Sequence, residues 1–195
     1  MEPAFTEKKE PKKEFLKEKK EEKKMDFIDL LDEDQVEVKK LTMEELEDAV
    51  KVMRKCAFDV TESEVKTIIE YDMSYGAFVN RMIIGVGLAW PASYDNEKRT
   101  ITGKEYNSIY IEDPAVLLAY EGRGIRRILL REREKEGISR NYSFSIAYLY
   151  EDIPKGSVVS YIKEAGSQLE KLYLSEDYEF FRTERGVLAV KRLNR

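Results

Sequence analysis

The sequence predicts an α/β fold in which a mixed sheet carries helices on both faces. β-rich runs alternate with helical patterns in the order β-α-α-β-β-β-α-β-α-β-β, without an internal repeat. Capping boxes, in which a Ser or Thr and a Glu three residues later satisfy free backbone amides, stand at three helix starts. Of the 195 residues, 42% are hydrophobic. That is enough apolar material for one core rather than two.

The first 34 residues are expected to form a charged arm, disordered or helical, ahead of a single domain over residues 35–195. Residues 1–24 contain nine Lys and seven Glu but few apolar side chains, so burial cannot offset the entropy of ordering them. Residues 25–34 can add a short docking turn. Because Glu alternates with Lys, a solvated tail is favoured over a basic tether for an anionic surface.

A short strand and two helices are expected next. Polar and apolar residues alternate over residues 36–39, as is typical of a strand. Thr42-Met-Glu-Glu45 is a capping box, and the apolar residues after it recur at i, i+3, i+4 and i+7. Thr61-Glu-Ser-Glu64 opens a second helix in the same way. Each helix therefore presents one apolar stripe to a core.

Three strands are expected in the middle of the chain. Two β-rich runs meet at the polar pair Asn80-Arg81, which predicts an antiparallel hairpin, and Pro91 closes its second strand. A polar loop over residues 93–104 leads to the third strand. Pro114 cannot donate a hydrogen bond to a ladder, so it marks a bulge or the end of that strand.

The second half of the chain predicts a helix, a strand, further helix and a closing hairpin. Gly122-Arg-Gly124 opens an amphipathic helix, for which Gly137 is a natural C-terminal residue. Residues 142–150 form a strand. The next apolar stripe is helical, and a capping box that begins at Ser167 can start a new helix within it. Residues 178–192 read as a hairpin.

The composition excludes several kinds of chemistry. Histidine is absent and cysteine occurs once, at Cys56. Disulfides, the common zinc sites and every histidine-dependent triad are thereby removed, and no metal is expected. Carboxylates, tyrosine, lysine or backbone amides must carry any reaction. The single cysteine also favours a reducing, cytoplasmic compartment.

Charge and hydropathy limit the kinds of partner that the chain is expected to bind. The net charge is −5; residues 1–24 contribute +2, so the remainder carries −7. An acidic domain favours cationic small molecules or Lys-rich peptides over nucleic acid. The longest uncharged apolar stretch, residues 82–92, is far shorter than the roughly 20 residues of a membrane span. We therefore expect no membrane partner.

One segment, from Tyr110 to Leu130, carries the chemistry. A strand runs into a glycine-bearing turn that opens a helix, so backbone amides and the positive helix end converge on one point suited to a pyrophosphate. Gly122 and Gly124 allow close approach of the backbone. Spacing alone leaves anion binding and a plain strand-to-helix turn equally open, and the pattern fits neither a dinucleotide fingerprint nor a Walker motif.

The segment resembles the acetyl-CoA-binding motif of the GCN5-related N-acetyltransferase (GNAT) superfamily, Arg/Gln-x-x-Gly-x-Gly/Ala after a strand of the type Ile-Glu-Asp-Leu-x-Val. A second stretch, Leu172 to Tyr178, is similar to the family's Leu-Tyr-x-x-x-Gly-Phe. The resemblance covers residues 36–193. It implies a mixed, mostly antiparallel sheet flanked by helices. It also implies transfer of an acetyl group from acetyl-CoA to a primary amine, of a small cationic molecule or of a protein or peptide, in a ternary complex.

The resemblance also implies cofactor-binding residues. Matched position by position, they are Val116, Leu118, Glu121, Gly122, Arg123, Gly124, Ile125, Arg126 and Arg127. An amide near Val116 would stabilise the developing oxyanion, and the amides from Gly122 onward would hold the pyrophosphate. The arginines could add charge there; a position on the solvated helix face is the alternative for each of them.

Two residues match the family's catalytic groups. Glu112 would remove the proton from the acceptor amine, and a carboxylate is a sensible base in a chain without histidine. Strand alternation places it on the face of Tyr110, opposite Asp113. Tyr173 would protonate the departing thiolate. The alternatives are an exposed strand glutamate and a packed helix aromatic.

Three departures from the family pattern bear on activity. Glu121 stands where Arg or Gln is preferred, Arg126 where Gly or Ala is preferred, and Asp177 where Gly precedes the aromatic residue. A carboxylate facing a pyrophosphate would weaken binding unless it pairs with a neighbouring arginine. The rival hypothesis is therefore a GNAT-fold interaction module without activity. A nucleic-acid-associated protein using the arm ranks third. The final hairpin could also pair across subunits in a homodimer.

Overall fold

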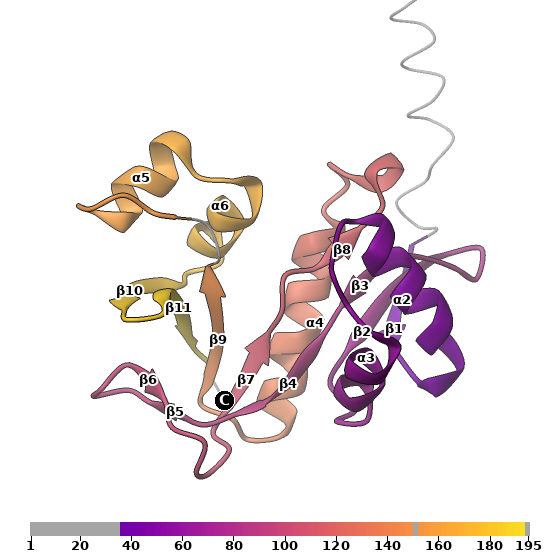
Figure 1. The fold of residues 1–195 in the computed structure, drawn as a ribbon, viewed down its shortest axis with the longest axis horizontal. Coiled ribbons are helices and arrows are strands. Elements are labelled where there is room, and N and C mark those ends of the chain that lie inside the picture. The colour runs from indigo at the N-terminus through magenta and orange to yellow at the C-terminus, as the bar shows by residue number, and fades with distance from the viewer. Residues whose placement is uncertain (1–35, 150–151, 194–195) are drawn as a thin grey trace, which may run out of the picture. The chain divides into compact units, whose positions relative to one another are not determined.

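The structure is a computed structural model that describes residues 36–149 and 152–193 (Figure 1). The chain from Val36 onward forms one compact unit. The expected arm over residues 1–34, with its short turn, lies outside the described residues. No helix in the described part of the chain is long and apolar enough to cross a membrane.

The strands form two sheets and a separate hairpin (Figure 1). The four-stranded sheet has the order β1-β2-β3-β8, with β1 (Glu37–Lys40), β2 (Tyr75–Val79), β3 (Met82–Gly87) and β8 (Ala115–Val116). The five-stranded sheet has the order β10-β11-β9-β7-β4, with β4 (Ala89–Ala92), β7 (Ser108–Ile111), β9 (Phe144–Leu149), β10 (Glu179–Thr183) and β11 (Gly186–Arg192). Only β7 and β9 pair in parallel in these sheets as described, so the expected mixed, mostly antiparallel arrangement is confirmed.

The helices begin where the sequence predicts. Along the chain they are the 3-10 turn η2 (Met43–Glu45), α2 (Leu46–Lys55), α3 (Glu62–Ile69), the 3-10 turn η3 (Leu118–Tyr120), α4 (Ile125–Ser139), α5 (Val158–Ala165) and α6 (Gln168–Ser175). Thr42, Thr61 and Ser167 each accept a backbone amide in a complete capping box. The box at Ser167 separates α5 from α6, because its cap replaces the hydrogen bonds that a continuous helix would make.

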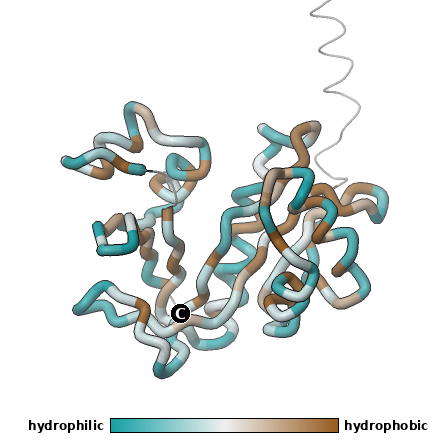
Figure 2. Tube along the Cα trace, in the orientation of Figure 1, coloured by the Kyte–Doolittle hydropathy of each residue, from teal (hydrophilic) through white to brown (hydrophobic). Residues whose placement is uncertain are grey.

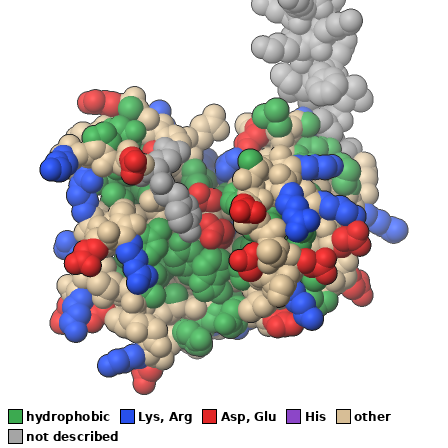
Figure 3. Space-filling model, in the orientation of Figure 1, with side chains coloured by type: hydrophobic (Ala, Val, Ile, Leu, Met, Phe, Trp, Pro, Cys, Tyr) green, Lys and Arg blue, Asp and Glu red, His purple; other side chains and the backbone are tan. Residues whose placement is uncertain are grey.

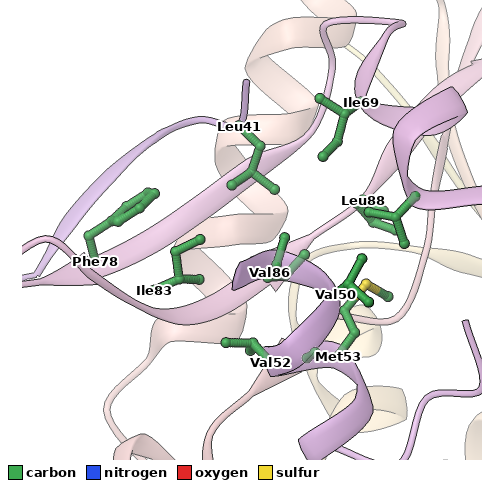
Figure 4. Packing of buried hydrophobic residues seen from close by; sticks show 12 residues of the cluster. Leu41, Val50, Val52, Met53, Ile69, Phe78, Ile83, Val86 and Leu88 are labelled. Atoms are coloured by element: carbon green, nitrogen blue, oxygen red, sulfur yellow. The ribbon is translucent and has the colours of Figure 1, made fainter. Parts of the chain in front are cut away.

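The helices divide the surfaces of the two sheets between them. Helices α2 and α3 cover one face of the four-stranded sheet, where Val50, Met53 and Ile69 pack with Phe78 and Ile83 (Figure 4). Helix α4 covers its other face. On the five-stranded sheet, α4, α5 and α6 cover the face that carries Ile111, Leu149 and Ala189.

The opposite face of the five-stranded sheet has no helix over it in the described residues. It carries Tyr110, Ile146 and Leu188, and it packs against the hairpin formed by β5 (Tyr94–Asp95) and β6 (Thr100–Ile101). We call it the open face. Hydrophobic side chains gather over β4, β7 and β9 in the space-filling view (Figure 3), whereas the tips of the surrounding hairpins are hydrophilic (Figure 2).

Three local features differ from the sequence prediction. The expected polar loop contains the β5–β6 hairpin. Pro91 lies inside β4 rather than after it, which an edge strand tolerates because the outer side needs no donor. Gly137 lies inside α4, which continues to Ser139. It permits close packing of the helix on the sheet, because a Cβ there would lie 2.8 Å from Ile109 Cγ2 and 3.0 Å from Leu193 Cδ1.

Replacing Gly137 by Ala tests this contact. In an ordinary helix interior the change stabilises by about 1 kcal/mol, but overpacking a core costs roughly 1–3 kcal/mol. We therefore expect Gly137→Ala to lower the free energy of unfolding, measured by urea denaturation. Lys135→Ala, at an exposed position of the same helix, is the control and should be neutral. A gain in stability for Gly137→Ala would contradict the close approach.

Candidate functional site

A fully buried arginine lies where the two sheets meet. Two paired strands are interrupted there: Leu88 separates β3 from β4, and residues 112–114 separate β7 from β8. Arg133 of α4, 0% exposed, donates from Nη1 to the carbonyl oxygens of Leu88 at 2.8 Å and Glu112 at 2.7 Å. Its Nε donates to the carbonyl of Leu129 at 3.0 Å. One guanidinium thus holds both strand breaks together.

The neighbours of Arg133 accommodate both its volume and its charge. A Cβ at Gly87 would lie 3.0 Å from Arg133 Nε and 3.1 Å from Cζ, so a larger residue there would press against the guanidinium. Burial lowers the pKa of Arg133, against the opposing charges of Tyr173, Tyr178 and the two carboxylates after β7. A guanidinium remains protonated in proteins, so a positive charge stands beneath the strand breaks.

Beyond these breaks the central strands diverge. β7 and β9 pair in parallel over Ser108–Tyr110 and Phe144–Ile146. β9 then continues beside β11, whereas the chain after β7 turns to the other sheet, where Val116 pairs with Gly85 of β3. The stretch from Glu112 to Val116 therefore runs along the line of divergence.

The turn after β8 begins helix α4 with its amides uncapped. Gly122 and Gly124 have φ values of 78° and 75°, which glycine adopts without strain. Gly124 is the N-cap residue of α4, and no side-chain hydrogen bond caps that end in the described residues. The amides of Ile125, Arg126 and Arg127 thus face outward at the positive end of the helix dipole.

A cavity of about 400 Å³ adjoins this helix end. Seven of the nine residues expected from the sequence to bind the cofactor line it: Val116, Glu121, Gly122, Gly124, Ile125, Arg126 and Arg127. Sequence reasoning missed the opposite wall, which α6 supplies with Gln168, Lys171, Leu172 and Ser175. Helix α6 lies more than 40 residues away in the chain, and the sequence pointed to it only through the match of Leu172 to Tyr178 with the family's second motif.

The other two expected cofactor residues lie elsewhere. Leu118 is 90% exposed. The Arg123 guanidinium lies 5.2 Å from the centre of the Tyr120 ring and donates to the carbonyl of Ala119 at 3.4 Å. Neither residue lines the cavity.

The charged residues of the turn pair with one another. Arg126 forms an ion pair with Glu121, with 3.2 Å between Nε and Oε2, and its Nη1 donates to the carbonyl of Pro114 at 3.1 Å. Arg127 Nε lies 2.8 Å from an oxygen of Glu176. The carboxylate of Glu121 is therefore neutralised by Arg126 at the two positions that depart from the family pattern. Lys171 makes no ion pair with a described carboxylate.

A second cavity, of about 640 Å³, lies on the other side of the same stretch. It extends between the α2–α3 connection and the strand breaks. Its apolar wall includes Met53, Phe58, Val60, Val65, Ile68 and Leu88. Its carboxylates are Asp59, Glu64, Glu112 and Asp113. The arrangement is suited to an amine on an apolar stem.

Glu112 and Asp113 both line this cavity, although alternation predicts opposite faces for them. The alternation fails because β7 ends at Ile111, and the two residues belong to the break. The Asp113 amide donates to Glu112 Oε1 at 3.0 Å. No group of three or more Cys, Asp or Glu in the described chain is arranged to hold a metal ion.

Tyr173 lies in the core between α6 and the five-stranded sheet. It is 1% exposed, and its ring centre lies 4.9 Å from that of Tyr178. It shares a cluster with Ile111, the last residue of β7. Asp177, which stands where the family has glycine, adopts a φ of 66°, a left-handed conformation that aspartate tolerates better than most residues.

Replacing Arg133 by Met tests the arginine's role at the strand breaks. Methionine fills much of the space but leaves the Glu112 carbonyl without its donor, at a cost of roughly 1–3 kcal/mol; the Leu88 carbonyl keeps the Glu112 amide. We expect Arg133→Met to lower the free energy of unfolding by about 2 kcal/mol in urea denaturation. Lys135→Gln, on the exposed side of α4, should change it by about 0.5 kcal/mol or less. Equal midpoints for the two variants would refute this role.

Comparison with solved structures shows which known fold the chain has. No protein-family model matches the chain, and no curated protein matches its sequence. Among solved structures, the GNAT domain of S. lividans PAT matches with a TM-score of 0.61 and 15% identity, covering 81% of this chain and 90% of that one.

Two further structures are similar. The ribosomal-protein alanine N-acetyltransferase of Escherichia coli matches with a TM-score of 0.56 and 13% identity over 82% of this chain and 95% of that one. A GNAT family acetyltransferase from Brucella melitensis, in complex with acetyl-CoA, matches with a TM-score of 0.53 and 13% identity over 82% and 89%. The divergent central strands, the glycine turn and these similarities agree: the chain has the GNAT fold.

Proposed function

We propose that this protein is an N-acetyltransferase that moves the acetyl group of acetyl-CoA to a primary amine in a ternary complex. One observation carries the proposal: a single stretch of five residues borders two cavities. Val116 lines the cavity at the uncapped start of α4, and Glu112 lines the cavity with four carboxylates. A cofactor and an acceptor bound in these cavities would approach each other along that stretch.

The first cavity suits acetyl-CoA by its chemistry. Its amides at residues 125–127 can donate to the pyrophosphate, and the helix dipole favours negative charge there. Lys171, opposite them on α6, adds a positive charge. The ion pair between Glu121 and Arg126 removes the repulsion that a lone carboxylate would cause. The Brucella melitensis protein of the same fold binds acetyl-CoA, which supports the assignment.

The reaction proceeds by direct attack. Glu112 takes a proton from the ammonium form of the acceptor, and the free amine attacks the thioester carbonyl carbon. An amide near Val116 stabilises the oxyanion, and the carbon–sulfur bond breaks. Tyr173 gives its hydroxyl proton to the leaving thiolate, and the second proton lost by the attacking nitrogen passes through water to the tyrosinate. Tyr173 lines neither cavity, so the ternary complex must bring its hydroxyl to the sulfur. Arg133, whose guanidinium holds the Glu112 carbonyl, fixes the backbone that carries the base. The carboxylates of the second cavity favour a cationic amine as acceptor.

Isothermal titration with acetyl-CoA tests the cofactor assignment. We expect saturable binding, weakened about tenfold by Lys171→Gln, since a charge-assisted contact with phosphate contributes about 1.5 kcal/mol or more. Lys163→Gln on α5, an exposed position outside the cavity, should bind as the wild type does. Absence of saturable binding at millimolar acetyl-CoA would refute the proposal.

Two substitutions test the catalytic assignments by thiol release over a panel of amines. Glu112→Gln should lower kcat about 100-fold or more at neutral pH, the usual contribution of a general base. Tyr173→Phe should lower kcat with little change in acetyl-CoA affinity. A large loss of acetyl-CoA affinity in Tyr173→Phe would contradict its assigned role as the acid. Acetyl-CoA binding without thiol release from any amine would favour an inactive binding module.

A further inference from the structure

A third cavity, of about 760 Å³, has an excess of positive charge in its lining. It lies between the β5–β6 hairpin and the β10–β11 turn. Four cationic residues line it, Lys98, Arg99, Arg182 and Arg185, against the single carboxylate of Glu184. Basic side chains border the hydrophobic surface of the open face on this side (Figure 3). The concentration of positive charge is notable in a chain whose net charge is −5.

None of the four cationic side chains forms an ion pair within the described residues, although backbone hydrogen bonds and the nearby charge of Lys98 lower the pKa of the Asp95 carboxyl. Arg182 donates to the carbonyls of Ile153 and Gly156, both at 3.1 Å, and Arg99 lies 4.1 Å from the centre of the Phe181 ring. These contacts hold the two guanidinium groups in place, but their partners are uncharged, so the positive charges are not cancelled.

The side chains of the other two, Lys98 and Arg185, form no hydrogen bond or ion pair in the described structure. Asp95, in the same hairpin, accepts the amides of Glu97 and Lys98 at 3.0 and 2.9 Å. Four like charges around one hollow repel each other, and a bound anion would relieve that repulsion.

The strand register connects this cavity with Glu112. Phe181 of β10 pairs with Leu188 of β11, which pairs with Tyr148 of β9. The β7–β9 ladder ends at Tyr110 and Ile146, two residues before Tyr148. Beyond it the two strands diverge, so Glu112 and Tyr148 are separated by more than one strand spacing. At about 4.8 Å between strands, Glu112 and Phe181 are therefore at least roughly 15 Å apart along the sheet.

The surface between the two ends is aromatic. The Trp90 and Tyr110 rings stack with centres 4.5 Å apart, and the Tyr148 amide donates to the Tyr110 hydroxyl at 3.2 Å. Tyr148 itself lines the basic cavity. An elongated ligand could therefore lie across the open face with one end at Glu112 and the other among the cations.

We propose that the acceptor carries an anionic group, a carboxylate or a phosphate, about 15 Å or more from its reacting amine, and that the basic cavity binds this group. The inference rests on the proposed function, which puts the amine at Glu112. A linear polyamine is disfavoured, because its second ammonium would meet four cationic residues. In an extended peptide, at 3.3–3.6 Å per residue, the acidic side chain would stand at about the fifth residue from the free N-terminus or later.

The test compares matched acceptors at saturating acetyl-CoA. One arm uses peptides with a free N-terminus and Glu, Gln or Lys at position five, six or seven; the other uses aminoalkyl phosphates of similar lengths and the corresponding alcohols. We expect kcat/KM for an anionic acceptor to exceed that of its neutral partner about tenfold, and the Lys peptide to be poorest. A preference in the first arm identifies a peptide carboxylate, and one in the second arm a phosphate ester.

The double variant Lys98→Gln, Arg185→Gln shows whether the cavity causes the preference. Neither side chain makes a hydrogen bond or an ion pair with a described group, so the melting temperature should be unchanged. The preference for the anionic acceptor should disappear, while kcat/KM for the neutral acceptor stays the same. Lys104→Gln, an exposed position before β7 that does not line the cavity, should retain the preference.

Two outcomes separate this inference from the proposed function. Saturable acetyl-CoA binding and turnover with equal kcat/KM for anionic and neutral acceptors would overturn the inference and leave the function. If acetyl-CoA does not bind, the function fails, and the cavity is tested by anisotropy of a labelled Glu peptide. Binding that the double variant abolishes would then support an anion site, and absence of binding would overturn it.

Discussion

A positive charge buried among backbone carbonyls determines where the two sheets separate. Arg133 bonds the carbonyls at both strand breaks, so β3 and β7 end at the same level and the chain after β7 must leave its sheet. That departure carries Glu112 into one cavity and Val116 into the other. Burying a guanidinium is costly unless its donors find acceptors, and here Nε and Nη1 donate to three carbonyl oxygens. Gly87 supplies the room that makes this burial feasible.

The arginines at the start of α4 act on protein groups more than on a ligand. The Arg126 guanidinium pairs with Glu121 and donates to the Pro114 carbonyl, and Arg127 forms an ion pair with Glu176. Backbone amides are then left as the main donors at the helix end, and an amide donates whatever side chain its residue carries. A phosphate-binding turn built on amides can therefore accept side chains that depart from the common pattern, provided that each charge finds a partner close by. At positions 121 and 126, the pairing of opposite charges therefore compensates for side chains that differ from the common pattern.

Local features of the fold could be predicted from the sequence, and contacts between distant segments could not. The capping boxes at Thr42, Thr61 and Ser167 involve residues three apart, so the sequence alone identifies them. The sequence wrongly predicted that α4 ends near Gly137. A glycine that ends a helix cannot be told apart, from sequence alone, from a glycine that lets a helix pack closely against a strand. The wall that α6 contributes to the cofactor cavity depends on tertiary packing. Most expected cofactor residues nevertheless gather there, since the turn that positions them is local.

The position of Pro91 has a consequence for association. The carbonyls of Leu88 and Ala92 accept amides from the neighbouring strand segment, so the backbone of the residues between them at positions 89 and 91 turns to the outer edge of β4. At Ala89 both outward-facing backbone groups bond to the Ser74 hydroxyl. The Ala89 amide donates to it at 3.1 Å, and it donates to the Ala89 carbonyl at 3.4 Å. At Pro91 the outer donor does not exist. An incoming strand would find no regular ladder along this edge, which protects the β4 side of the five-stranded sheet against extension by another chain.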